Sequence, residues 1–507
     1  MLHNLLLSID TNMVDWSRAQ FALTAIYHWL FVPLTLGLAI IMGIVETNYY
    51  RTKDTFWKTA AQFWQRLFGI NFAMGVATGI ILEFEFGTNW SNYSWFVGDI
   101  FGAPLAVEGI VAFFMESTFV AVMYFGWQKV SPGFHLASTW LTGLGATISA
   151  WWILVANAWM QYPVGCAFNP DTMRNEMVSF AEVALSPFAV SKFCHTVTSS
   201  WIIGAIFCVG VSCWYLMKRR HTRLALESIK IGAGVGLVAA LLAAATGHKS
   251  GMDVAEVQPM KLAAMEALYD GGTEQGLKIV EGLEVPYGLS IMATNDPKGY
   301  VPGINDILNG YTTPDGRVEP SVDEKMVRGQ KAIAALASYR KAKAAGEDGR
   351  AYLDTLNAHI KYFGYGYIRD RNDVVPPVWI NFWAFRVMVG VGCLFIVFFA
   401  VMLAVSYRWP KFLFGKRDIT TLPAWHYWLA IALIPLAYIG SECGWLVAEF
   451  GRQPWTIQDM LPTWVAVSDL QSSSVITTFF LFLILFTTML AVEINILLKQ
   501  IKKGPAV

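Results

Sequence analysis

The sequence has 507 residues, of which 55% are hydrophobic and only 15% are charged, and its formal net charge is zero. A composition this apolar excludes an ordinary soluble domain and is typical of a protein whose helices cross a membrane several times. The balanced charge gives no indication of a nucleic-acid partner, and none is expected.

Nine apolar stretches are long enough to cross a bilayer, which takes about 20 apolar residues. They predict an all-α polytopic membrane protein with nine transmembrane helices. In chain order, the stretches are residues 21–44, 67–86, 102–127, 135–160, 189–216, 228–247, 381–405, 424–447 and 473–497.

Basic residues follow every odd-numbered stretch, and cytoplasmic loops are the ones that carry such an excess. This pattern predicts a periplasmic N-terminus and a cytoplasmic C-terminus. The first residues show no basic segment followed by a small-residue cleavage site, so a cleaved signal peptide is not expected. The basic residues are Arg51, Lys53, Lys58, Lys129, Lys218, Arg219, Arg220, Arg223, Arg408, Lys411, Lys416, Arg417, Lys499, Lys502 and Lys503.

One connection between the stretches is much longer than the others. Residues 248–379 form a polar insertion between the sixth and seventh spans, which the predicted topology places on the periplasmic side. Its later half, around Lys331–Ile360, is rich in Ala, Lys and Leu and is expected to be helical. A connection of this length is more often functional than idle. The chain is therefore divided into helices one to six (1–247), an outer loop (248–379) and helices seven to nine (380–507).

Ionisable and thioether side chains interrupt several of the apolar stretches. A charge inside the hydrocarbon is costly, so an intramembrane ionisable residue is a functional-site candidate by default. At a helical rise of about 1.5 Å per residue, five potential metal ligands on five spans are predicted to share one layer near the outer face. They are His28, Glu108, His195, Met388 and Glu449.

His195 and Met388 are candidates for the two axial ligands of one haem. A histidine nitrogen and a methionine thioether can hold haem iron together, as in cytochromes c. Taken singly, each is more simply explained as a core residue, but the equal predicted depth and the neighbouring Arg386 favour the pair. A guanidinium at that position could bind a haem carboxylate through two hydrogen bonds.

His28 has no methionine at its depth, whereas Glu108 and Glu449 share its layer. A five-coordinate haem needs one protein ligand and one open position for a gas, and these three residues are candidates for such sites. Alternatively, either carboxyl could pair with an arginine or hold a proton. Arg452 follows Glu449 at the end of the eighth span, and Pro454 cannot continue that helix.

Glu116 stands eight residues beyond Glu108 in the same span, about 12 Å deeper toward the cytoplasm. Two membrane carboxyls in series are typical of a proton relay. Ser149 and Asn157 on the fourth span could extend it, although such residues also serve helix packing. Gly75-x-x-x-Gly79 is interpreted as a helix-packing motif.

Short motifs spread over nearly the whole chain form a specific set. They are residues 17–25 before His28, 68–73, 86–90, 98–105 before Glu108, 152–157, 192–193 before His195, 385–388, and Gly-Trp-Leu-Val-Ala-Glu-Phe-Gly-Arg-Gln-Pro-Trp at 444–455. Together they resemble subunit I of the cytochrome bd-type ubiquinol or menaquinol oxidases.

The resemblance implies three haems and no copper: a low-spin b haem, a high-spin b haem and haem d. It implies that His195 and Met388 hold the low-spin haem, which takes electrons from quinol. His28, Glu108 and Glu449 would serve the other two haems, where oxygen becomes water. Which residue ligates which haem stays open, as does a variant with b haems only.

Further roles come from the same resemblance. Trp445 and Arg452 would line the haem pair, and Glu108 and Glu116 would carry protons from the cytoplasm. The outer insertion resembles a quinol-binding loop of the long type, in which Lys261 and Glu266 match positions associated with quinol. These two are otherwise simply charges on a solvated helix. They do not share a helical face, so only a folded loop would bring them together.

The resemblance thus implies an enzyme that oxidises quinol at the outer face and reduces O₂ with cytoplasmic protons, separating charge without pumping. The haems would carry the redox chemistry, while the protein supplies ligands, burial and proton access. The expected partners are a second large membrane subunit, one or more small single-span subunits and membrane lipid. The expected location is the bacterial cytoplasmic (inner) membrane.

Three other classes explain the sequence less well. A haem–copper oxidase needs more histidines than the four in or near the spans, which are His28, His135, His195 and His426. A bis-histidine cytochrome b would carry paired histidines two helical heptads apart on one helix, and no span does. A transporter or channel would explain intramembrane charges, but not a His–Met pair at equal depth beside an arginine.

Overall fold

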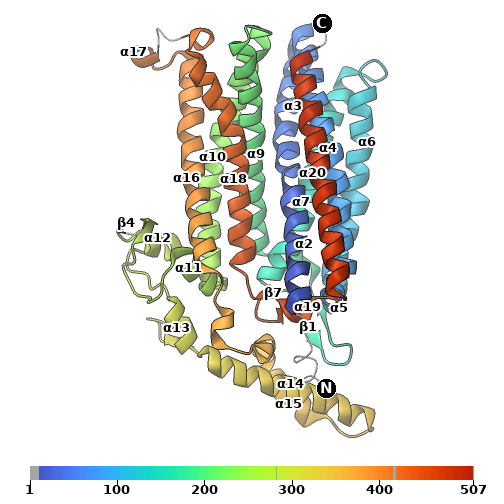
Figure 1. The fold of residues 1–507 in the computed structure, drawn as a ribbon, viewed down its shortest axis with the longest axis vertical. Helices are drawn as coiled ribbons and strands as arrows, with labels where there is room; N and C mark the ends of the chain where they lie inside the picture. Colours follow the sequence, from blue (N-terminus) through green and yellow to red (C-terminus); the bar gives the residue numbers. More distant parts are fainter. Residues whose placement is uncertain (1–10, 281, 415–417, 506–507) are drawn as a thin grey trace.

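The computed structural model describes residues 11–280, 282–414 and 418–505, and within these residues nine segments are long and apolar enough to cross a membrane. The prediction of an all-α protein with nine transmembrane helices is confirmed. The segments stand side by side in a bundle, with the start of the first and the end of the last at opposite ends (Figure 1). The sidedness of the bundle remains a prediction, and Lys416 and Arg417 lie outside the described residues.

Twelve helical elements make up most of these nine segments, and the short α8 (Phe180–Ala184) and η3 (Arg371–Val374) precede two of them. The twelve are α2 (Thr11–Trp29), α3 (Val32–Thr52), α4 (Thr55–Thr88), α5 (Ser91–Val107), η1 (Glu108–Phe113), α6 (Phe114–Phe125), α7 (Pro132–Gln161), α9 (Pro187–Met217), α10 (Thr222–Val257), α16 (Val378–Tyr407), α18 (Ala424–Phe450) and α20 (Ser472–Lys503).

The first span differs from its prediction because it consists of two helices. It begins at Thr11, ten residues before the predicted start, and breaks between Trp29 and Val32. Proline lacks an N–H group and is tolerated in the first turn of a helix but not in its interior, and Pro33 stands in the first turn of α3. Asn71 of α4 donates to the Phe31 carbonyl at 2.7 Å, which also accepts from the Thr35 N–H at 3.1 Å, so α4 is bonded directly to the break.

The third span is also irregular. Gly98 has a positive φ of 40° inside α5, a conformation that favours glycine. Further on, the six residues of η1 form a π-helix that continues directly into α6. Such π segments are rare and are often found at functional sites, and this one begins at Glu108.

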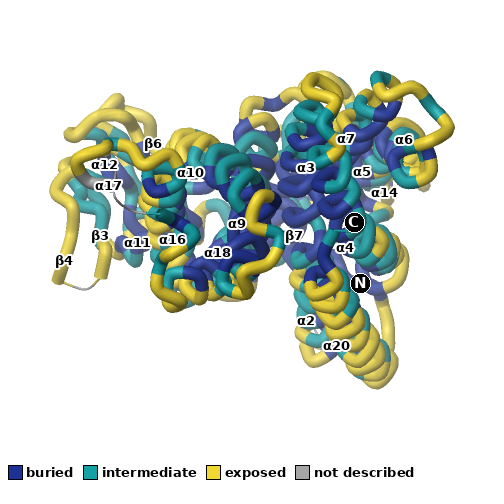
Figure 2. The backbone as a smooth tube through the Cα atoms, turned by 90° about the horizontal axis from the view of Figure 1, so that it is seen from above, coloured by how far each residue is buried: buried dark blue, intermediate teal, exposed yellow. Residues whose placement is uncertain are grey.

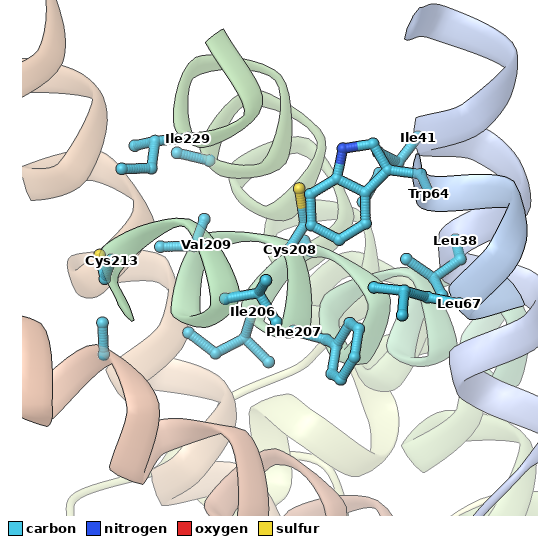
Figure 3. Close-up of a cluster of buried hydrophobic side chains, with 14 of the residues drawn as sticks. Leu38, Ile41, Trp64, Leu67, Ile206, Phe207, Cys208, Val209, Cys213 and Ile229 are labelled. Atoms are coloured by element: carbon cyan, nitrogen blue, oxygen red, sulfur yellow. The ribbon is translucent and has the colours of Figure 1, made fainter. Parts of the chain in front are cut away.

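Helix α9 lies at the centre of the bundle and is buried along most of its length (Figure 2). It packs against α3, α10 and α18. Gly37 of α3 meets Gly204 of α9 so closely that a Cβ atom on Gly37 would lie 2.6 Å from the Gly204 Cα atom. Small residues at a crossing let two helix backbones approach each other. Apolar side chains from α3, α4, α9 and α10 fill the space around this crossing (Figure 3).

A polar cluster lies buried between α3, α4 and α7, near the end of the bundle where α20 finishes. The Glu46 carboxylate contacts His135 Nδ1 at 2.6 Å and accepts a hydrogen bond from Thr139 at 2.6 Å and from Gln65 at 3.0 Å. His135 Nε2 faces the Met123 carbonyl at 3.1 Å. Both carboxylate oxygens and both ring nitrogens are satisfied, so the cluster joins α3, α4 and α7 and, through Met123, α6.

The outer insertion folds over the end of the bundle where α2 begins (Figure 1). Helix α10 continues to Val257, ten residues beyond the predicted end of the sixth span. The expected helical half of the insertion is present as α14 and α15. The elements of the insertion are α11 (Pro259–Glu266), β3 (Leu277–Val280), β4 (Leu283–Val285), α12 (Gly288–Thr294), α13 (Ile304–Asn309), β5 (Tyr311–Thr312), β6 (Val318–Glu319), α14 (Val322–Ala344) and α15 (Arg350–His359).

The strands form small hairpins only. Within the described residues, β3 pairs with β4 and β5 pairs with β6, both antiparallel. Two further antiparallel hairpins connect spans at the same end: β1 (Cys166–Asn169) with β2 (Arg174–Met177), and β7 (Trp455–Ile457) with β8 (Leu461–Pro462).

Candidate functional site

A cavity of about 830 Å³ lies between α2, α4, the third span, α7 and the end of α18. This volume is in the range of sites that hold small molecules or cofactors. Eight of the residues predicted from the sequence line it. They are His28, Glu108, Glu116, Ser149, Asn157, Trp445, Glu449 and Arg452.

The helices that carry His28 and Glu108 begin earlier than predicted, whereas Glu449 lies at the end of its span as predicted. His28 is 17 residues from the start of α2 rather than about seven, because α2 begins earlier than predicted. Glu449 is one residue from the end of α18. The three residues nevertheless share one cavity, since the helices that carry them enter it at different points along their lengths.

Thr78 of α4 holds the ring of His28. His28 Nδ1 is 3.0 Å from the Thr78 hydroxyl, and that hydroxyl lies 2.9 Å from the Met74 carbonyl, to which it donates. The Thr78 oxygen therefore accepts from Nδ1–H, which leaves the lone pair on Nε2. A neutral imidazole with a free Nε2 is the form that ligates a metal, and a hydrogen bond at the other nitrogen sets that form.

Glu108 begins the π-helix and reaches across to α7. Its Oε1 atom accepts from the Ser149 hydroxyl at 2.6 Å. Its Oε2 atom is buried without a hydrogen-bond partner among the described residues. A buried polar atom in this state is costly and is expected to meet a ligand, an ion or water. Glu116 lies deeper, buried against Gly145 of α7.

Glu449 and Arg452 contact each other directly, which is the pairing of a carboxyl with an arginine that the sequence left open. Arg452 Nη2 donates to Glu449 Oε2, and Arg452 Nη1 donates to the Thr456 carbonyl at 2.9 Å. Asn157 donates to the other Glu449 oxygen at 2.9 Å. Asn157 thus bonds to Glu449 rather than to Ser149, and the carboxylate is neutralised inside the protein by its own helix end.

His195 repeats the arrangement of His28 in a different part of the bundle. Its Nδ1 atom lies 3.1 Å from the carbonyl of Ala243 in α10. A carbonyl can only accept, so Nδ1 carries the proton and Nε2 keeps its lone pair. His195 does not line the 830 Å³ cavity, and neither does Met388.

A glycine on a neighbouring helix faces each of the three candidate axial ligands. A Cβ atom built on Gly79 would lie 3.1 Å from His28 Cε1, and one on Gly247 would lie 3.1 Å from His195 Cε1. A Cβ on Gly444 would lie 3.1 Å from Met388 Sδ. The glycines leave room for these side chains, and the free Nε2 atoms and the unpartnered Glu108 oxygen suit haem binding. Gly79, which was interpreted as part of a packing motif, belongs to this set.

Arg386, expected to bind a carboxylate of the haem at His195 and Met388, lies outside the 830 Å³ cavity, as those two residues do. Its Nη2 atom pairs with Glu266 at 2.7 Å, and the guanidinium also donates to the Met265 and Lys278 carbonyls. Burial raises the pKa of Glu266, and the positive charge of Arg386 partly opposes that shift. Arg386 therefore fastens the outer insertion to α16.

Lys261 and Glu266 both lie on α11, but their side chains reach different helices. Lys261 is 2% exposed, and its Nζ atom donates to Gln161 at 2.7 Å and to Gln258 at 2.8 Å. Burial lowers the pKa of Lys261 well below its usual range, and the nearby cations Lys192 and Arg452 lower it further. Because both residues are buried, the interpretation of α11 as a solvated charged helix is excluded. The fold nevertheless gives Lys261 and Glu266 different partners, Gln161 and Arg386.

Glu442 is a cavity residue that sequence reasoning missed. It lines the cavity two turns before Glu449 on α18, and neither of its carboxylate oxygens has a hydrogen-bond partner among the described residues. The spacing of seven residues, which puts both carboxyls on one helix face, was the available signal. Trp29 of α2, which packs edge-on against Trp445 at 5.1 Å, was also missed.

The fold and the site together define a polytopic membrane protein with a cavity among its helices that potential metal-ligating side chains line. The family model for cytochrome bd terminal oxidase subunit I matches residues 16–505. The chain therefore belongs to this family.

Relatives of known identity agree over nearly the whole length. The chain is 40% identical to cytochrome bd-II ubiquinol oxidase subunit 1 of Escherichia coli (strain K12), over 98% of this chain and 97% of that protein. It is 34% identical to cytochrome bd ubiquinol oxidase subunit 1 of Bacillus subtilis (strain 168), over 96% and 93% respectively. The fold matches a bd oxidase structure from Geobacillus thermodenitrificans with a TM-score of 0.77 and 24% identity, covering 97% of this chain and 99% of that one.

Proposed function

We propose that this chain is the haem-bearing subunit of a respiratory quinol oxidase in the bacterial inner membrane. Its enzyme class is that of a quinol:oxygen oxidoreductase, as membership of the cytochrome bd family indicates. The proposed enzyme oxidises quinol at the outer face, reduces O₂ to water with cytoplasmic protons and builds a proton motive force without pumping. A second large subunit and small single-span subunits complete it.

One observation supports the proposal most directly. His28 presents a free Nε2 atom, and it lines one cavity with Glu108 and Glu449. A histidine fixed in this tautomer by a second residue is a prepared metal ligand. Two haems, a high-spin b haem and haem d, would be held by these three residues, with Trp445 and Arg452 beside them. His195 and Met388 would hold the low-spin b haem.

Other residues of the chain would serve proton transfer and quinol access. Haem, when bound, supplies one-electron transfer and oxygen chemistry. Glu116 and Glu108 line the same cavity in series and would move protons inward, with Ser149 bonded to Glu108 at 2.6 Å as the next group. The outer insertion, anchored through Arg386 and Glu266, would admit quinol near Lys261.

A reduced-minus-oxidised spectrum of the purified complex, together with quinol-dependent oxygen uptake, tests the proposal. We expect low-spin and high-spin b bands, a chlorin band toward the red end and uptake that needs quinol. Absence of haem bands would reject the proposal. Absence of the chlorin band alone would replace haem d by a third b haem.

A further inference from the structure

A row of four hydrogen-bonded side chains joins the outer insertion to the cavity; Lys261 and Gln161 are buried, and Asn157 and Glu449 are half-buried. Lys261 Nζ on α11 donates to Gln161 Oε1 at 2.7 Å. Gln161 Nε2 donates to Asn157 Oδ1 at 2.7 Å, one turn earlier on α7. Asn157 Nδ2 then donates to Glu449 Oε1 at 2.9 Å. The row therefore begins at the amino group of Lys261 in the outer insertion and ends at a candidate haem ligand.

The chemistry of the row gives it a single direction. Lys261 Nζ donates to Gln161, so Gln161 turns its oxygen toward Lys261 and its NH₂ group toward Asn157. Asn157 must then accept from Gln161 and offer its own NH₂ group to Glu449. A carboxylate, which only accepts, completes the sequence. Turning one amide over would place two donors or two acceptors against each other, so the two ends fix the orientation of both amides.

The row is also rigidly held. Gln161 is fully buried, and Lys261 is 2% exposed. A Cβ atom on Gly451 would lie 2.7 Å from Lys261 Cγ, so the lysine stem packs against the backbone between Glu449 and Arg452. Hydrogen bonds inside a protein are stronger than in water and polarise one another along a chain. Three consecutive hydrogen bonds therefore allow a change at Lys261 to affect the Glu449 carboxylate.

We propose that Gln161 and Asn157 are positioning residues through which Lys261 sets the orientation and the charge distribution of Glu449. The inference rests on the proposed function, because it joins the insertion that would take quinol to the cavity that would reduce oxygen. Amides carry no group that titrates near neutral pH, so the row transmits orientation rather than protons. Asn157 acts as a link in this row and not as a step of the proton path.

The test is a double-mutant cycle read by the absorption spectrum and midpoint potential of the haem in the Glu449 cavity. Lys261→Met removes the amino group with its hydrogen bonds and keeps the length of the stem, and Gln161→Leu removes the hydrogen bonds of the next residue in the row. In the otherwise wild-type complex, Lys261→Met should shift the band and the potential. In the Gln161→Leu background, adding Lys261→Met should shift neither further, since coupled residues give non-additive effects.

Gln258 provides the matched control. It accepts the other hydrogen bond from Lys261 but donates onward to Gln458 at 3.0 Å, away from Glu449. In a Gln258→Leu background, Lys261→Met should still produce the full shift. If Gln161→Leu does not assemble, Gln161→Glu retains an oxygen for Lys261 and replaces the donor facing Asn157, and the shift should again be lost.

Two results would overturn the inference: no spectral or potential shift from Lys261→Met alone, or an equal shift with and without Gln161. Failure of the proposed function has a different signature. In that case the wild-type complex itself would lack haem bands or quinol-dependent oxygen uptake, before any variant is compared.

Discussion

Thr78 accepts a hydrogen bond from His28 Nδ1 at 3.0 Å, and it does so because its own proton is directed to the Met74 carbonyl. One hydroxyl on α4 thus decides which nitrogen of a histidine on α2 is free. The contact also spans the end of α2, two residues before the break in the first span.

Replacing Thr78 by valine should weaken haem binding at His28, because Nδ1 would then have no hydroxyl acceptor and either tautomer could form. Loss of such a partner typically lowers metal affinity by about 10–100-fold. Thr78→Ser keeps the hydroxyl and should behave like the wild type. Haem content and the high-spin absorption bands of the purified complex measure both variants, and equal spectra for valine and serine would contradict the assignment.

The glycines that face the candidate ligands predict a sharp steric effect. Gly444→Ala should reduce the low-spin haem signal, because the new methyl would lie 3.1 Å from Met388 Sδ and displace it. Gly390→Ala is the matched control on α16, where a Cβ atom would meet nothing within 4 Å.

His195→Ala should abolish the low-spin haem signal. A low-spin signal that survives His195→Ala would exclude this histidine as its ligand.

Glu116→Gln should slow oxygen reduction while every haem stays bound. The amide keeps the shape of the side chain against Gly145 but cannot take up and release a proton. Quinol-driven oxygen uptake and the haem spectrum, measured on the same sample, separate the two effects. Glu493→Gln on α20 offers a control, since Glu493 is also a buried carboxyl but does not line the cavity. Turnover at the wild-type rate would remove Glu116 from the proton path.

The lowered pKa of Lys261 predicts a pH dependence of the docked outer insertion. A group whose pKa is depressed by folding contributes stability above its unfolded pKa, and that stability is lost as the pH falls through the folded value. Below its ordinary pKa of about 10.4, the unfolded lysine is protonated whereas the buried one resists protonation. Lowering the pH should therefore loosen the insertion in the wild type and do so less in Lys261→Met. Limited proteolysis of residues 248–379 across a pH series measures this, and parallel profiles would contradict it.

Most of the fold could be predicted because long apolar stretches have few alternatives in a membrane. All nine predicted spans overlap an observed segment, although several segments begin or end about ten residues outside the predicted bounds. The break in the first span was missed because the apolar run continues through it, and Pro33 alone could mark a kink as well as an end. The π-helix left no trace in the apolar pattern, since every residue from 109 to 113 is small or apolar.

The sequence predicted which residues belong to the site, but not which residues contact each other. His28, Glu108 and Glu449 were grouped because ionisable residues and potential metal ligands are rare inside spans. This reason holds even where the predicted depth of a residue is inexact. The partners of Arg386 could not be predicted, because Glu266 is 120 residues away in sequence and reaches it only through the fold of the insertion. Lys261 reaches Gln161 across 100 residues in the same way.

The π-helical turn at Glu108–Phe113 carries one last consequence. On an α-helix, eight residues at about 100° each would leave Glu108 and Glu116 roughly 80° apart. A π turn absorbs one extra residue, so the two carboxyls stand as if they were seven apart, about 20° from alignment. A relative with one residue fewer and a regular α-helix would present the same pair, whereas one more residue would turn Glu116 away.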